Sequence, residues 1–201
     1  MPCSPDAEAA PARLPGLPLL VAMLLLALGA RPALTADAPG AGFRVESVAV
    51  RLLDDVYRLD ATIDFDFSDE SLEALENGVP LTVVIDMEIM RERRFLDERV
   101  GAVSARYRIR KHALSGQYVV TNEASGEAMT YQTFREMRAS LGRVTDFPMI
   151  DAHAIAAEEH YLLRLRVRLD IEALPSPLRP LAYLSSLWRL SSGWSEWPLR
   201  R

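Results

Sequence analysis

The chain has 201 residues, with 23 Lys and Arg against 28 Asp and Glu, so its formal net charge at pH 7 is −5. This acidic balance argues against broad binding to nucleic acid, which usually requires a net basic surface. Hydrophobic residues make up 49% of the chain, an ordinary share for a globular protein, and the length predicts one folded domain.

An apolar run over residues 17–30, LPLLVAMLLLALGA, lies near the start of the chain and follows Arg13. The run is shorter than the roughly 20 residues that a membrane-spanning helix needs. It therefore predicts a secretory signal peptide over residues 1–36, cleaved after Ala36. Because the first residues are barely basic, an uncleaved anchor formed by residues 17–30 remains the alternative.

The only cysteine of the chain, Cys3, lies inside this predicted signal peptide. The rest of the chain has no thiol and cannot form a disulfide, so it must be stabilised by a hydrophobic core. It is long enough to build one. We expect residues 37–42 to be a flexible lead-in and residues 43–199 to be a single domain.

Alternating apolar and polar residues predict several half-buried strands. The clearest is residues 161–174, where apolar residues alternate first with arginines and then with acidic residues. Asp54 and Asp55 predict a hairpin turn between two of the strands. The other predicted strands cover residues 43–53, 59–67, 80–92, 100–111 and 117–122.

Two short helices are expected between the strands. The first lies in SDESLEALENG, where Ser68 is a good N-cap and Gly78 a good stop. The second covers residues 131–141, with Thr130 before it and Gly142 after it. Many strands with one polar face and few helices indicate an all-β fold, an antiparallel β-sandwich with two short helices.

Like charges line one face of three predicted strands. One interpretation is a cationic surface that binds an anionic partner, such as lipid headgroups or a phosphate-bearing ligand. The other is pairing of arginine with aspartate across neighbouring strands, which we favour because half-solvated antiparallel strands show such alternation. The residues are Arg106, Arg108 and Arg110, then Arg164, Arg166 and Arg168, and then Asp60, Asp64 and Asp66.

The stretch DAHAIAAEEH places Asp151, His153 and His160 close together with two glutamates. Zinc uses such ligands, so a metal-binding protein or metal-dependent hydrolase is the alternative function. The two histidines are seven residues apart, which does not match the spacing of four in HExxH. A polar loop or short helix is the favoured interpretation, and the residues are weak candidates for a metal site.

Ser115 follows His112 by three residues in KHALSGQY. A nucleophilic serine needs a base within hydrogen-bond reach and a third group that orients the base. Ser-Gly is also an ordinary turn sequence, and the chain contains neither a nucleophile-elbow motif nor a glycine-rich nucleotide motif. The sequence therefore predicts no cofactor and favours a protein without catalytic activity.

All three tryptophans fall within WRLSSGWSEW, residues 188–197. Neither the strand period nor the helix period places all three on one face, and the Ser-Ser-Gly between them favours a bend. We expect Trp188 and one other tryptophan to be buried. Either Trp194 or Trp197 is then left near the surface, and both are candidate binding residues.

Three stretches occur together in this chain: LENGVPLTVVIDMEI, RIRKHALSGQYVVTN and LRPLAYLSSLWRLSSGWSEWPL. Their order and spacing resemble domain-of-unknown-function family 4390, a group of bacterial exported proteins, over residues 43–199. The family tends to carry a tryptophan near RERRFLDERV, where this chain has Phe95. The resemblance implies export to the periplasm and brings no activity, because the family has none assigned.

Members of this family are often encoded near a ribosomal RNA methyltransferase and a membrane sensor kinase, so the resemblance implies an accessory role in envelope sensing. We expect a periplasmic, non-catalytic binding or accessory module of the bacterial cell envelope. Its partner would be an envelope protein or a membrane sensor kinase, and not a nucleic acid. Membrane contact is expected only through the N-terminal segment, as an inner-membrane anchor, if that segment is retained.

Overall fold

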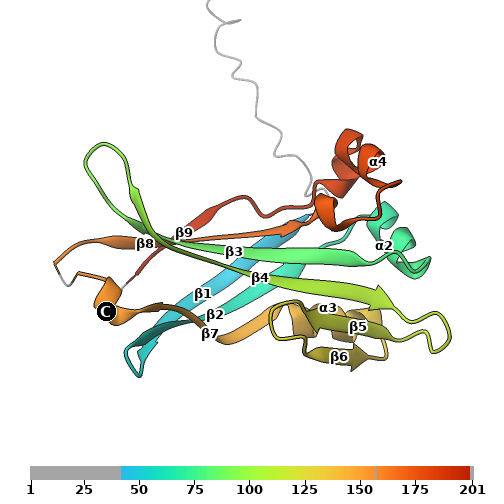
Figure 1. Ribbon diagram of the computed structural model, residues 1–201, viewed down its shortest axis with the longest axis horizontal. Coiled ribbons are helices and arrows are strands. Elements are labelled where there is room, and N and C mark those ends of the chain that lie inside the picture. Colours follow the sequence, from blue (N-terminus) through green and yellow to red (C-terminus); the bar gives the residue numbers. More distant parts are fainter. Residues whose placement is uncertain (1–41, 157, 200–201) are drawn as a thin grey trace, which may run out of the picture. The chain divides into compact units, whose positions relative to one another are not determined.

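The computed structural model describes residues 42–156 and 158–199, which belong to one compact unit (Figure 1). The predicted signal peptide, the alternative anchor over residues 17–30 and most of the predicted lead-in lie outside the described residues. No helix in the described part of the chain is long and apolar enough to cross a membrane.

The strands form two antiparallel sheets, and the predicted β-sandwich is confirmed. The three-stranded sheet has the order β1 (Phe43–Leu53), β2 (Val56–Phe65) and β7 (Arg143–Asp151). The six-stranded sheet has the order β6 (Ala128–Tyr131), β5 (Tyr118–Asn122), β4 (Glu98–Lys111), β3 (Leu81–Arg91), β8 (Tyr161–Leu169) and β9 (Ser195–Pro198). In Figure 1, β1 and β2 run diagonally behind β3 and β4.

One hydrophobic core lies between the sheets and is built from alternate residues of each strand. On β8, Leu163, Leu165 and Val167 are fully buried, while the arginines between them are only partly covered. Leu59 and Phe65 are buried in the same way on β2. The alternation that predicts these strands also decides which of their faces meets the core.

The predicted hairpin between β1 and β2 is present. Asp54 and Asp55 have φ values of 49° and 58°, and Leu53 pairs with Val56. Positive φ at both central residues is the mark of a type I′ turn, which matches the twist of two paired strands. Aspartate adopts this conformation more readily than most residues do.

The first predicted helix is α2 (Asp69–Glu76), and the side chain of Ser68 accepts a hydrogen bond from the backbone N–H of Ser71. The second is α3 (Phe134–Leu141), which ends at Gly142 as expected. The predicted start of α3 was wrong, because Thr133 and not Thr130 caps the helix. Thr130 instead pairs with β5 as part of β6.

Several elements have no counterpart in the sequence prediction. Besides β6, β7 and β9, they are α4 (Arg179–Leu184) and the 3-10 helices η2 (Ile171–Ala173) and η3 (Ser186–Trp188). The 3-10 helix η1 (Ala152–Ala154) lies in the stretch DAHAIAAEEH, where a polar loop or short helix is the favoured interpretation of the sequence. Pro180 lies in the first turn of α4, where a missing N–H is tolerated. The strand expected to reach residue 174 ends at Leu169, because Asp170 caps η2.

Candidate functional site

The two arginine rows flank the central strand β3 in the six-stranded sheet. Val84 of β3 pairs with Arg106 on one side and with Arg168 on the other, and Asp86 pairs with Arg166. The rows are therefore separated by a strand that carries carboxylates. This arrangement removes the repulsion that two adjacent arginine strands would suffer.

Asp86 lies at the centre of these arginines and is 8% exposed. Its carboxylate accepts hydrogen bonds from Arg166 at 2.8 Å, from Arg168 at 2.9 Å and from Ser104 at 2.8 Å. Burial favours the neutral acid, but the hydrogen bonds from the two arginines and the serine outweigh it, so the pKa of Asp86 is lowered. Asp86 is thus the counter-ion that allows two arginines to lie side by side.

Other arginines of the two rows are also paired with carboxylates. Arg106 contacts Asp170 at 2.5 Å and Glu123 at 3.0 Å. Glu123 also pairs with Arg108 at 2.5 Å. Arg164 pairs with Glu196 at 3.2 Å. Pairing of this kind on the outer face of a sheet stabilises the sheet and leaves little charge for a ligand.

The aspartates singled out on β2 do not take part in this network, because β2 belongs to the other sheet. Asp60 pairs with Arg51 at 2.7 Å. Asp64 pairs with Arg138 at 3.2 Å and with Arg44 at 3.4 Å. Arginine and carboxylate do pair on both sheets, but the aspartates of β2 pair with arginines of β1 and α3 and not with the two arginine rows.

The three tryptophans have three different environments. Trp188 is 8% exposed, and Trp197 on β9 packs against the core. Trp194 lies over two arginines of β8, with its ring centroid 5.0 Å from Cζ of Arg164 and 4.5 Å from Cζ of Arg166. The expectation of a second buried tryptophan was wrong, because Trp194 and Trp197 are both only partly buried. Trp194 is the one that touches the arginine row.

Arg110 is exposed and makes no ion pair with any of the described residues. Together with Arg108 it lines a shallow hollow of about 480 Å³ beside β5. Glu123 lines the same hollow and is already paired with Arg108. The hollow therefore offers one uncommitted guanidinium group, which is too little charge to mark an anion site by itself.

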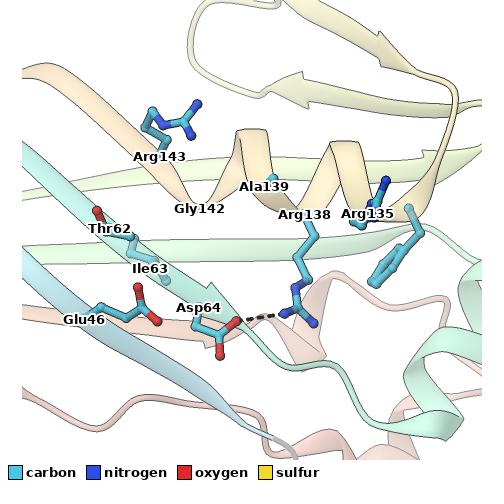
Figure 2. Close-up of a pocket in the computed structure, with 10 residues that line it drawn as sticks. Glu46, Thr62, Ile63, Asp64, Arg135, Arg138, Ala139, Gly142 and Arg143 are labelled. Atoms are coloured by element: carbon cyan, nitrogen blue, oxygen red, sulfur yellow. Dashed lines mark ion pairs between the residues drawn. The ribbon is translucent and has the colours of Figure 1, made fainter.

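A second hollow, of about 440 Å³, lies beside α3 and β2. Figure 2 shows Arg138 pointing toward Asp64, with Glu46 of β1 facing the same space. Arg143 points away from this ion pair in the same view. Because the arginines around the hollow do not converge on one point, we do not assign it as an anion site.

A family model described as "Domain of unknown function (DUF4390)" matches residues 40–198. The chain belongs to this family. Comparison with curated proteins and with solved structures gave no significant match. The features of the DUF4390 domain must therefore be interpreted from its own geometry.

In the DUF4390 domain, the side chains of the candidate metal residues Asp151 and His153 form a hydrogen bond with each other. His153 Nδ1 lies 2.8 Å from Asp151 Oδ1, and both side chains are mostly exposed. The hydrogen bond that the imidazole donates to the Asp151 carboxylate raises the pKa of His153. His160 is not part of this pair, and the described residues contain no group of three His, Cys, Asp or Glu side chains that could hold a metal ion.

Ser115 and His112 are close to each other in the turn between β4 and β5. Ser115 Oγ lies 3.2 Å from His112 Nδ1, and the backbone N–H of Ser115 points to the same nitrogen at 3.4 Å. Both residues are exposed, and no acidic side chain among the described residues contacts the imidazole. The geometry is that of a hydrogen-bonded turn and lacks the third group that catalysis needs.

The sequence did not reveal an exposed apolar cluster on α4 and η3. We call it the α4–η3 surface, and it consists of Leu181, Tyr183, Leu184 and Leu187, which are 64%, 50%, 84% and 43% exposed. The only signal for it was the high proportion of apolar residues in LRPLAYLSSLWRL, which the fold does not fully bury. Composition alone does not say which of these side chains remain exposed to water.

Buried residues on the inner side of α4 and η3 attach the α4–η3 surface to the rest of the domain. Ala182 on the opposite side of α4 is fully buried, and Trp188 fixes η3 to the core. Ser68, which is 2% exposed, donates a hydrogen bond to the backbone oxygen of Leu187 at 2.7 Å. The exposed side chains are therefore held in place by buried neighbours and are not a mobile loop tip.

Proposed function

We propose that this DUF4390 domain is an exported, non-catalytic module that binds a protein of the bacterial cell envelope through the α4–η3 surface. The observation that carries the proposal is the gathering of four large, exposed apolar side chains within seven residues of chain. Contact between such groups and water is unfavourable, and a contiguous apolar patch is typical of a protein-binding site.

The surroundings of the patch also support binding to a protein. Helix α2 contacts η3 and exposes Asp69, Glu70 and Glu73 along one border. Arg179 and Arg189 flank the patch in the chain. An apolar centre with a charged rim is the usual composition of a protein interface. Tyr183 adds an aromatic side chain, a residue type that often dominates binding energy.

The charged outer face of the six-stranded sheet is less suited to this role. Most of its arginines are paired with carboxylates of the same domain, so a ligand would have to displace those pairs. We assign the arginines of that face to stabilisation of the sheet. The periplasmic location in the proposal is supported by the apolar N-terminal segment with its predicted cleavage site.

The proposal is tested by chemical crosslinking of the tagged protein in intact cells, followed by capture from the envelope. The test variant is Leu181→Asp/Leu184→Asp, which places two charges in the patch at exposed positions. The control is Leu114→Asp, because Leu114 is 94% exposed in the turn between β4 and β5. Circular dichroism would verify that both variants fold.

We expect the wild type and Leu114→Asp to capture the same protein. The double variant should recover at least about tenfold less of that protein, because loss of hot-spot residues weakens binding by this amount or more. Equal recovery by all three proteins would contradict the assignment of the α4–η3 surface. Absence of any reproducible partner would contradict the proposed function itself.

A further inference from the structure

Four strands form the edges of the two sheets, and they differ in how well they are protected. β6 and β9 have four residues each, and β9 contains Pro198. β7 contains Pro148, and its pairing with β2 is interrupted by two register shifts. β1 has eleven residues and no proline. Short strands, prolines and bulges prevent an edge from pairing with another chain, and β1 has this protection only near its start.

The hairpin fixes which backbone groups of β1 face the open edge. In the type I′ turn, the backbone groups of Leu53 and Val56 point at each other and close the turn. Hydrogen-bonded and non-hydrogen-bonded pairs alternate along an antiparallel ladder. The N–H and C=O groups of Val48, Val50 and Leu52 therefore point away from β2, and they have no backbone partner among the described residues.

The side chains of these same three residues lie on the core side of the sheet. Their partners on β2 are Ala61, Leu59 and Tyr57, which are 5%, 0% and 1% exposed. Leu52 is nevertheless 48% exposed, and Val48 and Val50 are only partly buried. A strand added to the edge of β1 would pair the open backbone groups and would also cover this apolar row.

We propose that β1 pairs with β1 of a second copy of this chain, antiparallel and about a two-fold axis at Val50. In this register Val50 faces its own copy, and Val48 faces Leu52 of the second copy. All of these residues direct their free backbone groups outward, so each facing pair can exchange two hydrogen bonds. The two three-stranded sheets would become one continuous sheet.

The register is compatible with the charges and with the shape of the strand. Arg51 faces Ala49 of the second copy, and it is already paired with Asp60. The register shift between Val45 and Ser47 ends the regular ladder, so the contact is limited to residues 47–53. In this register apolar residues face apolar residues on the core side, and Arg51 faces the small Ala49 on the outer side. This match of β1 with itself favours a second copy over an unrelated extended segment. The α4–η3 surface takes no part, so this inference does not depend on the proposed function.

The proposal is tested first by the mass of the full chain in solution, measured by light scattering over a range of concentrations. We expect the mass to rise from one chain to two with increasing concentration. Val50→Pro removes one outward-facing N–H without removing a bond to β2, so it should abolish the dimer and retain the fold. A dimer that persists in folded Val50→Pro would overturn the proposal.

Disulfide crosslinking tests the register and does not depend on whether Val50→Pro folds. In a Cys3→Ser background, Val50→Cys should give a covalent dimer on oxidation, because facing residues lie within the distance that a disulfide spans. The control Ala49→Cys should give none, because residue 49 faces residue 51 of the second copy and not itself. A chain that stays monomeric at every concentration, or that crosslinks equally through both positions, would contradict the pairing.

Discussion

The indole ring of Trp194 lies over the guanidinium group of Arg166, with 4.5 Å between the ring centroid and Cζ. Arg164 lies against the same ring at 5.0 Å. A tryptophan from the segment before β9 thus covers part of the arginine row of β8, while Trp188 is buried in the core. These two tryptophans should differ in what they contribute to the free energy of unfolding.

Replacement of Trp188 should be far more costly than replacement of Trp194. Trp188→Ala leaves a cavity in the core and should lower the free energy of unfolding by about 3–5 kcal/mol. Trp194→Ala removes contacts with two partly exposed arginines and should cost about 1 kcal/mol. Urea unfolding followed by circular dichroism measures both losses. Equal losses for the two variants would show that the assigned environments are wrong.

Removal of the charge on Asp86 should destabilise the six-stranded sheet. Asp86→Asn leaves Arg166 and Arg168 side by side without their shared counter-ion. Because both arginines keep about a third of their side chains exposed, we expect a loss of about 2–3 kcal/mol in the free energy of unfolding. Asp66→Asn is the matched control, since the described structure records no ion pair for Asp66. A loss no larger than that of the control would contradict the role of Asp86.

Stability should fall in acid because of lowered carboxyl pKa values in the folded state. A hydrogen bond from Arg91 lowers the pKa of Glu98, and one from Arg106 lowers the pKa of Glu123. The pKa of Asp86 is lowered as well. The unfolded chain therefore binds more protons than the folded one, and stability rises with pH. Their contribution is complete above the unfolded carboxyl pKa values of about 4. It is lost as pH falls through the folded-state values.

The pH dependence can be checked by measuring the urea midpoint at a series of pH values below neutrality. Asp86→Asn should show a smaller change in the free energy of unfolding over the acidic range than the wild type, because one of the linked groups is gone. An identical pH dependence in the two proteins would mean that Asp86 has the same pKa in the folded and unfolded states.

The phenol group of Tyr118 should ionise at a higher pH than that of an ordinary tyrosine. Burial, followed by its hydrogen bond to Glu76, raises the pKa of Tyr118 to about 12. Burial also raises the pKa of Tyr107. Absorbance titration of the phenol groups should therefore show a high-pH component that is smaller in Tyr118→Phe than in the wild type. Glu76→Gln should lower the pKa of Tyr118 only in part, because burial is the larger cause. A high-pH component of unchanged amplitude in Tyr118→Phe would contradict its assignment to Tyr118.

The β-sandwich could be predicted from sequence because most of its strands carry a strong local signal. On β8, every second residue from Tyr161 to Leu169 is buried, so the period of two alone identifies both the strand and its core face. Ser68 and the Asp54-Asp55 pair gave equally local signals for a helix start and a turn. Local patterns of this kind are not affected by the order of strands in the sheet.

The features that could not be predicted depend on contacts between distant segments. β6 and β9 are too short to show a period, and Thr130 resembled a helix cap although it pairs with β5. Asp86 lies in the apolar run of β3, and its role became visible only when β4 and β8 were placed on either side of it. The exposure of Leu184 likewise depends on packing, because composition does not distinguish a buried leucine from an exposed one.

The proposed function is tested most directly by photo-crosslinking in living cells. A benzophenone side chain would replace Tyr183 of the α4–η3 surface or, as the control, Phe95, which is 99% exposed at the tip of the β3–β4 hairpin. We predict one discrete envelope-protein adduct from position 183, lost when Leu184→Asp is added, and no such adduct from position 95. No adduct at position 183, or the same adduct from both positions, would contradict binding through the α4–η3 surface.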